Sequence, residues 1–437
     1  MTNTIKEVLE FVDENDVKFI RLGFCDLFGT QKNISIMSDE LEDAFENGVS
    51  FDASAVGGFG DVSGSDMLLF PDPTTLMVLP WRPGPGRVVR FYCDIKNAEN
   101  MAVQGDSRYL LKQAVKRCEK MGYTCKIGAE CEFYLFKTDE NGEPTFETLD
   151  KGGYLDIAPI DKGENIRKEI CLALAEMGLK PETSHHEEGP GQNEIDFMFG
   201  NALECADNLM TFKSAVKSIA ARNGLFASFL PKPIKGESGS GLHVNLSLSQ
   251  NGKNIFRNEN GHSKIAENFA AGILDKVAEM TLFLNPIPNS YERFGEGKAP
   301  KYVSWSNQNR SQLLRIPISR GEKVRVELRS PDPAINPYVA FALIVNAGLD
   351  GIEKELALQK AIDFDLHKAD ESVIDTLTPL PNSFEKAIAL AKDSEFIRNV
   401  LGEELCSRYL QTKEIEAAES IKEENQEAYV AKYFSII

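Results

Sequence analysis

Four short segments of this chain alternate charged or polar residues with apolar ones, the pattern of a strand with one buried face. In KIGAECEFYLF, Glu130 and Glu132 are two residues apart, so both side chains lie on the same face of the predicted strand. The other three segments align further polar residues in the same way: Gln192, Glu194 and Asp196; His243, Asn245 and Ser247; Arg325, Glu327 and Arg329. Because helices are predicted between these strands, the pattern indicates a sheet backed by helices, with a polar site on its open face. Taken singly, each segment also fits an ordinary solvated strand face.

Composition and charge exclude several classes of protein. With 48 Lys and Arg against 67 Asp and Glu, the net charge of −19 argues against nucleic acid or an anionic membrane as the main partner. The eight cysteines form no CxxC pair, which is typical of reduced thiols in a cytoplasmic protein. No apolar run approaches the roughly 18–20 residues of a membrane span, and the N-terminus lacks the features of a signal peptide. We therefore expect a cytoplasmic protein with no membrane partner.

The chain is long enough for two or three domains at about 150 residues each. In the first hundred residues, a helix over 4–14 precedes short strands over 18–24, 32–37, 76–81 and 87–94, which suggests a small α+β unit. Beyond it, the predicted strands alternate with longer amphipathic segments. Helices are predicted over 107–121, 164–177, 206–223, 263–284 and 334–358, and the chain from residue 373 onward is helix-forming.

The acidic residues of the predicted strands have the chemistry of a site for hard divalent cations. Carboxylate oxygens, with an occasional imidazole nitrogen, suit Mg²⁺ or Mn²⁺. Six residues are enough for two such ions: Glu130, Glu132, Glu187, Glu194, His243 and Glu327. Four arginines suited to binding phosphate or carboxylate lie within twenty residues of one another: Arg310, Arg315, Arg325 and Arg329. The spacing alone favours a metal-dependent phosphoryl-transfer enzyme, with plain surface charge as the competing interpretation.

Seven motifs, in order from about residue 15 to the C-terminus, resemble those of the glutamine synthetase family. FDASAVGGF resembles the FDGSS segment, GAECEFYLF the GPEAEFFLF strand, and KGGYLDIAP the KGGYF…P segment of that family. HHEEGPGQNEIDF is similar to the two-glutamate metal segment, and GESGSGLHV to the NGSGMH loop. NSYERFGEGKAPKYVSWSNQNRSQLLRIP resembles the flap and arginine segment, and RVELRSPDPAINPYVAFA the RVExRxPDPxxNPY strand. The chain is similar to the type I form that lacks the extra segment with an adenylylated tyrosine.

The resemblance implies an α+β fold. Its small N-terminal β-grasp domain would cover about residues 1–100, and a larger catalytic domain, with an antiparallel sheet backed by helices, residues 101–437. It also implies a homo-oligomer, a dodecamer of two stacked hexamers, in which Asp52 of one subunit serves the site of its neighbour. The implied reaction joins glutamate and ammonium with ATP through γ-glutamyl phosphate.

The resemblance also implies a role for each matching position. One metal site would be Glu132, Glu187 and Glu194, and the other Glu130, His243 and Glu327, with His185 and His186 outside both. Glutamate would meet Gly239, Arg293 and Arg329. The nucleotide would meet Glu182, Phe199 and Ser247, with Arg310, Arg315 and Arg325 around its phosphates. Asp52 would bind and deprotonate ammonium, in a pocket lined by Tyr154.

Departures from the family cluster on the amine side. The flap glutamate that normally precedes Ala-Pro is replaced by Lys298, in a flap one residue shorter than usual, and Glu296 lies two residues before it. Three readings remain: a glutamine synthetase that uses ammonium, with Glu296 or Asp52 compensating; a ligase that joins glutamate to another amine; and a regulator that binds nucleotide with weak activity. A lysine at this position repels ammonium unless its own charge is lost.

Overall fold

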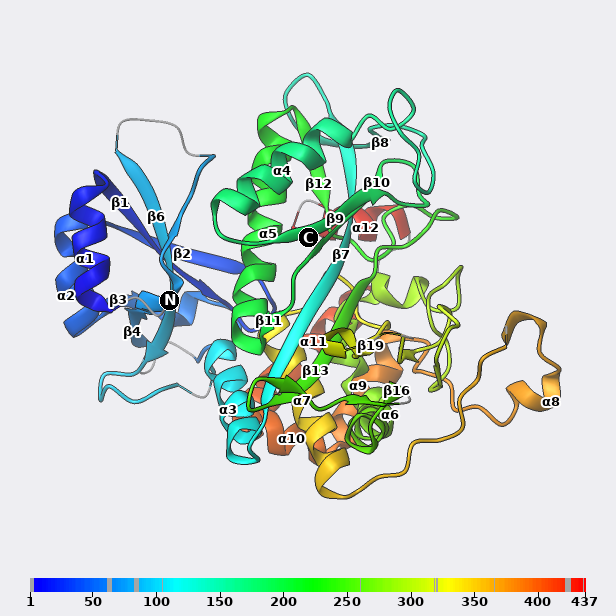
Figure 1. The fold of residues 1–437 in the computed structure, drawn as a ribbon. Coiled ribbons are helices and arrows are strands. Elements are labelled where there is room, and N and C mark those ends of the chain that lie inside the picture. The colour runs from blue at the N-terminus through cyan, green and yellow to red at the C-terminus, as the bar shows by residue number, and fades with distance from the viewer. Residues whose placement is uncertain are drawn as a thin grey trace.

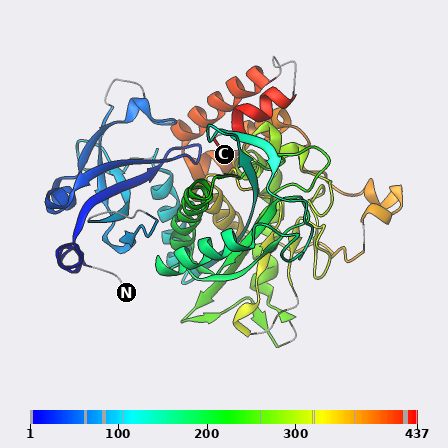
Figure 2. The same cartoon turned by 90° about the horizontal axis from the view of Figure 1, so that it is seen from above.

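The protein is described by a computed structural model that covers residues 4–60, 65–81, 86–103, 105–259, 261–317, 319, 321–364, 366–420, 426–434 and 436–437. Two sheets organise the chain, one in the small N-terminal part and one in the larger remainder (Figure 1). The small part lies to one side of the large one in both views (Figures 1 and 2). The predicted α+β class, with a small unit followed by a larger one that contains a sheet and helices, is confirmed.

The small sheet has the strand order β2-β1-β6-β4-β3, with β5 beside β6. Its strands are β1 (Val17–Cys25), β2 (Gln31–Met37), β3 (Val49–Asp52), β4 (Asp66–Pro71), β5 (Met77–Val78) and β6 (Arg87–Lys96). Helices α1 (Ile5–Glu14) and α2 (Leu41–Asn47) belong to the same unit. Thr4 caps α1 in a capping box with Glu7. Val8 of α1 and Ile20 of β1 are fully buried in the core of this unit.

The large sheet has the order β17-β18-β19-β13-β7-β10-β9 and is antiparallel except for the parallel pair β17 and β18. Its main path consists of β7 (Thr124–Thr138), β9 (Pro181–His186), β10 (Gln192–Phe197), β13 (Leu242–Gln250), β17 (Trp305–Ser306), β18 (Leu314–Arg315) and β19 (Val326–Leu328). Shorter strands lie alongside: β8 (Pro144–Thr148), β11 (Gly200–Asn201), β12 (Leu225–Ser228) and β14 (Lys253–Asn254). A separate hairpin is formed by β15 (Arg257–Asn258) and β16 (Gly261–His262).

The larger part of the chain also contains ten α-helices among the described residues. They are α3 (Ser107–Lys120), α4 (Glu164–Glu176), α5 (Ala202–Arg222), α6 (Lys264–Leu284), α7 (Pro337–Glu353), α8 (Glu371–Ile374), α9 (Phe384–Asp393), α10 (Glu395–Leu401), α11 (Glu403–Ser420) and α12 (Gln426–Phe434). Of these, α3 and α5 contact β7, and α4 contacts β9 and β10. Helix α7 packs against α3, α5 and α6 and is buried over most of its length. Among the described helices, none combines the length and the apolar character needed to cross a bilayer.

Most predicted elements are present, but several bounds were wrong. The predicted strand over 76–81 is reduced to β5, because Pro80 has no N–H to continue the pairing. Helix α5 begins four residues earlier than predicted, where the Glu204 carboxylate accepts a hydrogen bond from the Asn201 N–H at 3.4 Å. Helix α7 begins three residues later than predicted, because Asn336 caps it and Pro337 occupies its first turn.

Candidate active site

Strand register brings the four polar faces together. On the central strand β7, Glu132 lies opposite Glu194 of β10, and Glu130 lies opposite His243 of β13. Glu327 of β19 lies opposite Asn245 of β13. Because side chains opposite one another in an antiparallel pair share a face, these acidic residues meet on one surface of the sheet. Most of them are buried there.

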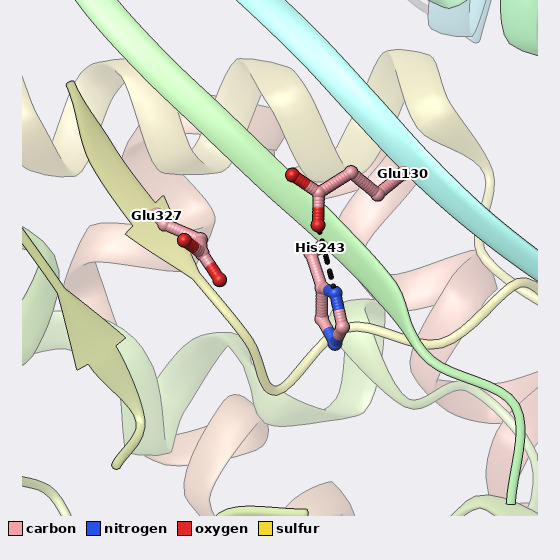
Figure 3. Close-up of side chains that lie close together, drawn as sticks. All are labelled: Glu130, His243 and Glu327. Carbon is pink, nitrogen blue, oxygen red and sulfur yellow. Dashed lines mark hydrogen bonds and ion pairs between the residues drawn. The ribbon is translucent and has the colours of Figure 1, made fainter. Parts of the chain in front are cut away.

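The first cluster consists of Glu130, His243 and Glu327, from three adjacent strands (Figure 3). Their ligand atoms lie within 4.8 Å of one another, and His243 Nδ1 is 3.1 Å from Glu130 Oε2. Burial by itself raises the pKa of Glu130, but the hydrogen bonds from His243 and Asn245 outweigh it and lower that pKa to about 2. Two carboxylates and one imidazole form a donor set that fits Mg²⁺ or Mn²⁺.

The second cluster is centred on Glu194, which belongs to two overlapping groups of close ligand atoms. Glu132, Glu194 and His243 form one group, and His185, Glu187 and Glu194 form the other. The predicted trio of Glu132, Glu187 and Glu194 is thus divided between two groups, with Glu194 common to both. His185 was predicted to lie outside both metal sites, but its Nε2 atom lies 3.0 Å from Glu187 and 3.4 Å from Glu194. His185 therefore lies within this cluster.

Electrostatics in the second cluster favours a bound cation. Burial, and then the charge of Glu132, raises the pKa of Glu194. Burial is also the main reason that the pKa of Glu132 is raised, with Glu187 adding to it. Buried carboxylates that repel one another are stabilised in their ionised form by a divalent cation between them. The residues present therefore fit a metal ion at this place as well.

Both clusters open into one cavity of about 290 Å³. Its wall also contains most of the predicted glutamate, phosphate and flap residues: Tyr154, Gly239, Arg293, Glu296, Lys298, Arg310, Arg315, Arg325 and Arg329. Arg315 and Arg329 donate to the two oxygens of Glu327 at 2.9 and 2.6 Å. Gly239 is required by close packing, since a Cβ there would lie 2.7 Å from the Pro231 carbonyl oxygen. Arg293 is buried and donates to the carbonyl oxygen of Ser330 at 2.9 Å, and burial lowers its pKa.

A second cavity, of about 280 Å³, contains the three predicted nucleoside contacts, Glu182, Phe199 and Ser247. It shares Glu130, Asp196 and Arg325 with the first cavity. The two cavities are therefore adjacent, with one cluster of carboxylates and an arginine between them. This arrangement suits a molecule whose phosphates reach the metal clusters while its other end lies against Phe199.

The two charged flap residues have different partners. The carboxylate of Glu296 forms an ion pair with the ammonium group of Lys232, whose side chain is 3% exposed. Lys298 Nζ lies 2.6 Å from Glu188 Oε1 and 5.2 Å from the centroid of the Tyr154 ring. The carboxylate of the flap, Glu296, is therefore already neutralised by a lysine.

Asp52, the residue predicted to bind ammonium, lies outside both cavities. It ends β3 in the small domain and is not among the described residues that line either cavity. Its carboxylate accepts hydrogen bonds from the Ser54 hydroxyl and backbone N–H, which lower its pKa. Within one chain, Asp52 therefore does not join the other site residues.

The structure adds cavity-lining residues outside the predicted set: Asp196, His185, Glu188, Ser238 and Ala299. Asp196 continues the alternation of Glu194, so the sequence pattern contained its signal. Glu188 lies in the turn after β9, outside any alternating pattern, so no signal in the sequence indicated that it would line the cavity. His186 is buried outside the cavity wall, where its ring nitrogens bond Asp150 and the Glu187 carbonyl oxygen.

Comparison with known proteins agrees with this geometry. Two family models match the chain, "Glutamine synthetase, beta-Grasp domain" over residues 16–98 and "Glutamine synthetase, catalytic domain" over residues 104–433. Glutamine synthetases from Clostridium saccharobutylicum and Methanosarcina mazei are each 46% identical to it, over 94% of this chain and 95% and 94% of their own lengths. A solved complex of GmaS with ADP has a TM-score of 0.88 at 29% identity and covers 98% of both chains. The predicted resemblance is thus confirmed, and the chain belongs to the glutamine synthetase family.

Proposed function

We propose that this protein is an ATP-dependent ligase that joins ammonium to the γ-carboxylate of glutamate, giving glutamine, ADP and phosphate. The observation that carries the proposal is one cavity that combines two carboxylate clusters with four arginines, Arg310, Arg315, Arg325 and Arg329. The ADP in the solved GmaS complex supports a nucleotide in the adjoining cavity beside Phe199. The near full-length identity to glutamine synthetases supports the same reaction.

The chemistry explains why these groups are needed. A carboxylate does not react with ammonia at neutral pH, because oxide is too poor a leaving group. Transfer of the γ-phosphoryl group of ATP to a γ-carboxylate oxygen releases ADP and forms an acyl phosphate. Ammonia then attacks the carbonyl carbon and phosphate leaves, while a nearby carboxylate takes the proton lost from ammonium.

Each group of site residues has a role in these two reaction steps. Arg329 and Arg293 would hold the carboxylates of glutamate, and the remaining arginines would stabilise charge on the transferred phosphoryl group. Divalent ions, Mg²⁺ or Mn²⁺, would be held by Glu130, His243 and Glu327 and by Glu132, Glu187 and Glu194, and would supply neutralisation of the phosphate oxygens.

A glutamate-dependent ADP-release assay, with glutamine measured directly, tests the proposal. The protein is expected to form glutamine from ammonium in the presence of ATP and Mg²⁺. Glu327→Gln, which keeps the size of a side chain bonded by two arginines, is expected to lower kcat at least about a hundredfold. Glu140→Gln, in the exposed turn after β7, is the matched control and is expected to retain full activity. Normal turnover by Glu327→Gln would contradict the metal assignment.

A second candidate is the same ligase chemistry with a different amine. It is favoured by the flap, where Glu296 is paired with Lys232 and a lysine takes the position before Ala-Pro. Parallel assays with ammonium and small primary amines separate the two, because the preferred amine has the higher kcat/KM. Failure to turn over any amine would favour the regulator.

We further propose a cytoplasmic homo-oligomer, a dodecamer of two stacked hexamers, in which Asp52 completes the site of the neighbouring subunit. The separation of Asp52 from the cavities of its own chain supports this arrangement. The cytoplasm is where ATP and glutamate are available as substrates. We also propose that the two domains divide at about residue 100. The small sheet contains only strands before this point and the large sheet only strands after it, which supports the division.

A further inference from the structure

The wall of the cavity near the flap contains a small cation site that is filled by a side chain of the protein itself. Lys298 Nζ is 2.6 Å from a carboxylate oxygen of Glu188 and 5.2 Å from the centre of the Tyr154 ring. The rings of His185 and Tyr154 pack in a T-shaped contact, with 5.6 Å between their centroids, which restricts the orientation of the tyrosine ring. All four side chains line the cavity of the metal clusters.

These contacts are those that an ammonium group requires. A carboxylate neutralises its charge, and the face of an aromatic ring attracts a cation within about 6 Å. The Lys298 side chain ends in a primary ammonium, so the geometry already accommodates one. The side chains of Lys298 and Glu188 are 50% and 40% exposed, and a half-exposed ion pair on a loop is readily exchanged for another cation.

Other acidic groups near the flap are committed elsewhere. Glu296 is paired with Lys232, and Glu187 is 3.0 Å from His185 in the second metal cluster. Asp52 is outside the cavity of its own chain among the described residues. Among the described residues of the cavity wall, Glu188 is therefore the carboxylate whose cation partner is a half-exposed lysine of the flap, Lys298.

We propose that Glu188 and Tyr154 form the entry site for the amine substrate in its ammonium form, and that Lys298 is an internal competitor which the amine must displace. Glu188, which follows β9, thus supplies a negative charge that the flap lacks at position 298, where it carries a lysine. The inference rests on the proposed ligase function and names the residues that select its cationic substrate. Glu188 acts as a specificity-determining residue, and Lys298 sets the apparent affinity.

Steady-state kinetics with ammonium as the varied substrate test this inference. Lys298→Met removes the competitor and keeps the apolar stem, so KM for ammonium is expected to fall severalfold with little change in KM for glutamate or ATP. Glu188→Gln is expected to raise KM for ammonium about tenfold or more, since a charge-assisted contact is lost. The double variant is expected to resemble Glu188→Gln alone, because a competitor has no effect on a site that is already lost. Lys301→Met, three residues further along the loop, is the control.

Two results separate the inference from the function on which it rests. If the wild-type protein forms no product, the proposed function is wrong. If it is active and the KM for ammonium is the same in wild type, Lys298→Met and Glu188→Gln, the entry site is wrong and the ion pair is a surface contact.

A binding measurement gives an independent test. Reductive ¹³C-methylation of the lysines yields one dimethyl resonance that is lost in Lys298→Met and thereby identifies Lys298. Titration with methylammonium chloride is expected to shift this resonance saturably as the group leaves the Tyr154 ring. Sodium chloride at the same ionic strength is expected to have little effect. An equal response to both salts would overturn the proposal.

Discussion

At the scale of single residues, the site depends on carboxylates that repel one another. Glu194 is buried beside Glu132, and both pKa values are raised. We expect Glu194→Gln to increase the free energy of unfolding of the metal-free protein by about 1–2 kcal/mol, because folding no longer buries a carboxyl group that ionises readily in the unfolded chain. Wild type should gain about 2.7 kcal/mol when Mg²⁺ or Mn²⁺ reaches a hundred times its Kd, and the variant should lose most of that gain. Denaturant unfolding with and without metal measures both effects, with exposed Glu140→Gln as the control.

His186 and Asp150 form a buried pair that makes stability depend on pH. Both ring nitrogens of His186 face acceptors, Asp150 at 2.9 Å and the Glu187 carbonyl oxygen at 2.7 Å, which favours the doubly protonated ring. Burial alone lowers the pKa of His186, but these hydrogen bonds raise it overall. A raised pKa means that the contribution to stability is complete below about pH 6.5, the unfolded value, and is lost as pH rises through the folded value.

We therefore expect Tm to fall as pH rises above about 6.5, and we attribute part of that fall to His186. Asp150→Asn should be less stable at pH 6, by about 3–5 kcal/mol, and should lose this part of the fall. Thermal unfolding of wild type and variant over the same pH series measures both. An unchanged slope in Asp150→Asn would exclude the pair as its origin.

At the scale of elements, strand register and one buried arginine hold the site in place. A one-residue slip of β10 or β13 against β7 would turn their polar faces toward the helices, so the burial of the opposite face fixes the register. At the start of α3, Arg108 forms ion pairs with three carboxylates. Two belong to the small domain, Asp72 at 2.9 Å and Asp94 at 2.8 Å, and the third is Asp207 of α5 in the large one, at 2.9 Å. The guanidinium is 4% exposed and joins the small domain to the large one.

We expect Arg108→Met to lower the free energy of unfolding by about 3–5 kcal/mol, because the buried carboxylate of Asp207 loses its counter-ion. The reason is electrostatic, since methionine keeps most of the apolar volume. Lys6→Met, which removes an exposed ion pair in α1, should change stability by less than about 1 kcal/mol. Urea unfolding of both variants provides the comparison, and equal effects would contradict a bridging role for Arg108.

At the scale of the whole molecule, the position of Asp52 makes a prediction about assembly. If each site combines Asp52 of one subunit with the metal clusters of the next, a mixture of two inactive variants must recover activity. Asp52→Asn and Glu327→Gln subunits, dissociated and reassembled in equal amounts, are expected to regain about a quarter of wild-type activity, because a random quarter of the interfaces pair two intact partners. Scattering should show one large assembly. No recovery in a correctly sized assembly would place Asp52 outside the site.

The sequence by itself determined the two-part α+β fold, the four polar strand faces and most of the cavity wall. The strand faces depend on a local rule, because residues two apart in a strand share a face whatever lies beside them. Tyr154, Gly239, Arg293 and the flap residues were instead predicted from the resemblance of their motifs to those of a known family. The sequence did not determine which charged side chains of the site form ion pairs with one another. Lys298 and Glu188 are 110 residues apart, and Lys232 and Glu296 are 64 apart. Only the tertiary structure, which sets strand register and the path of each loop, decided that one flap carboxylate is neutralised and that a lysine fills a cation site, because such contacts leave no period in the chain.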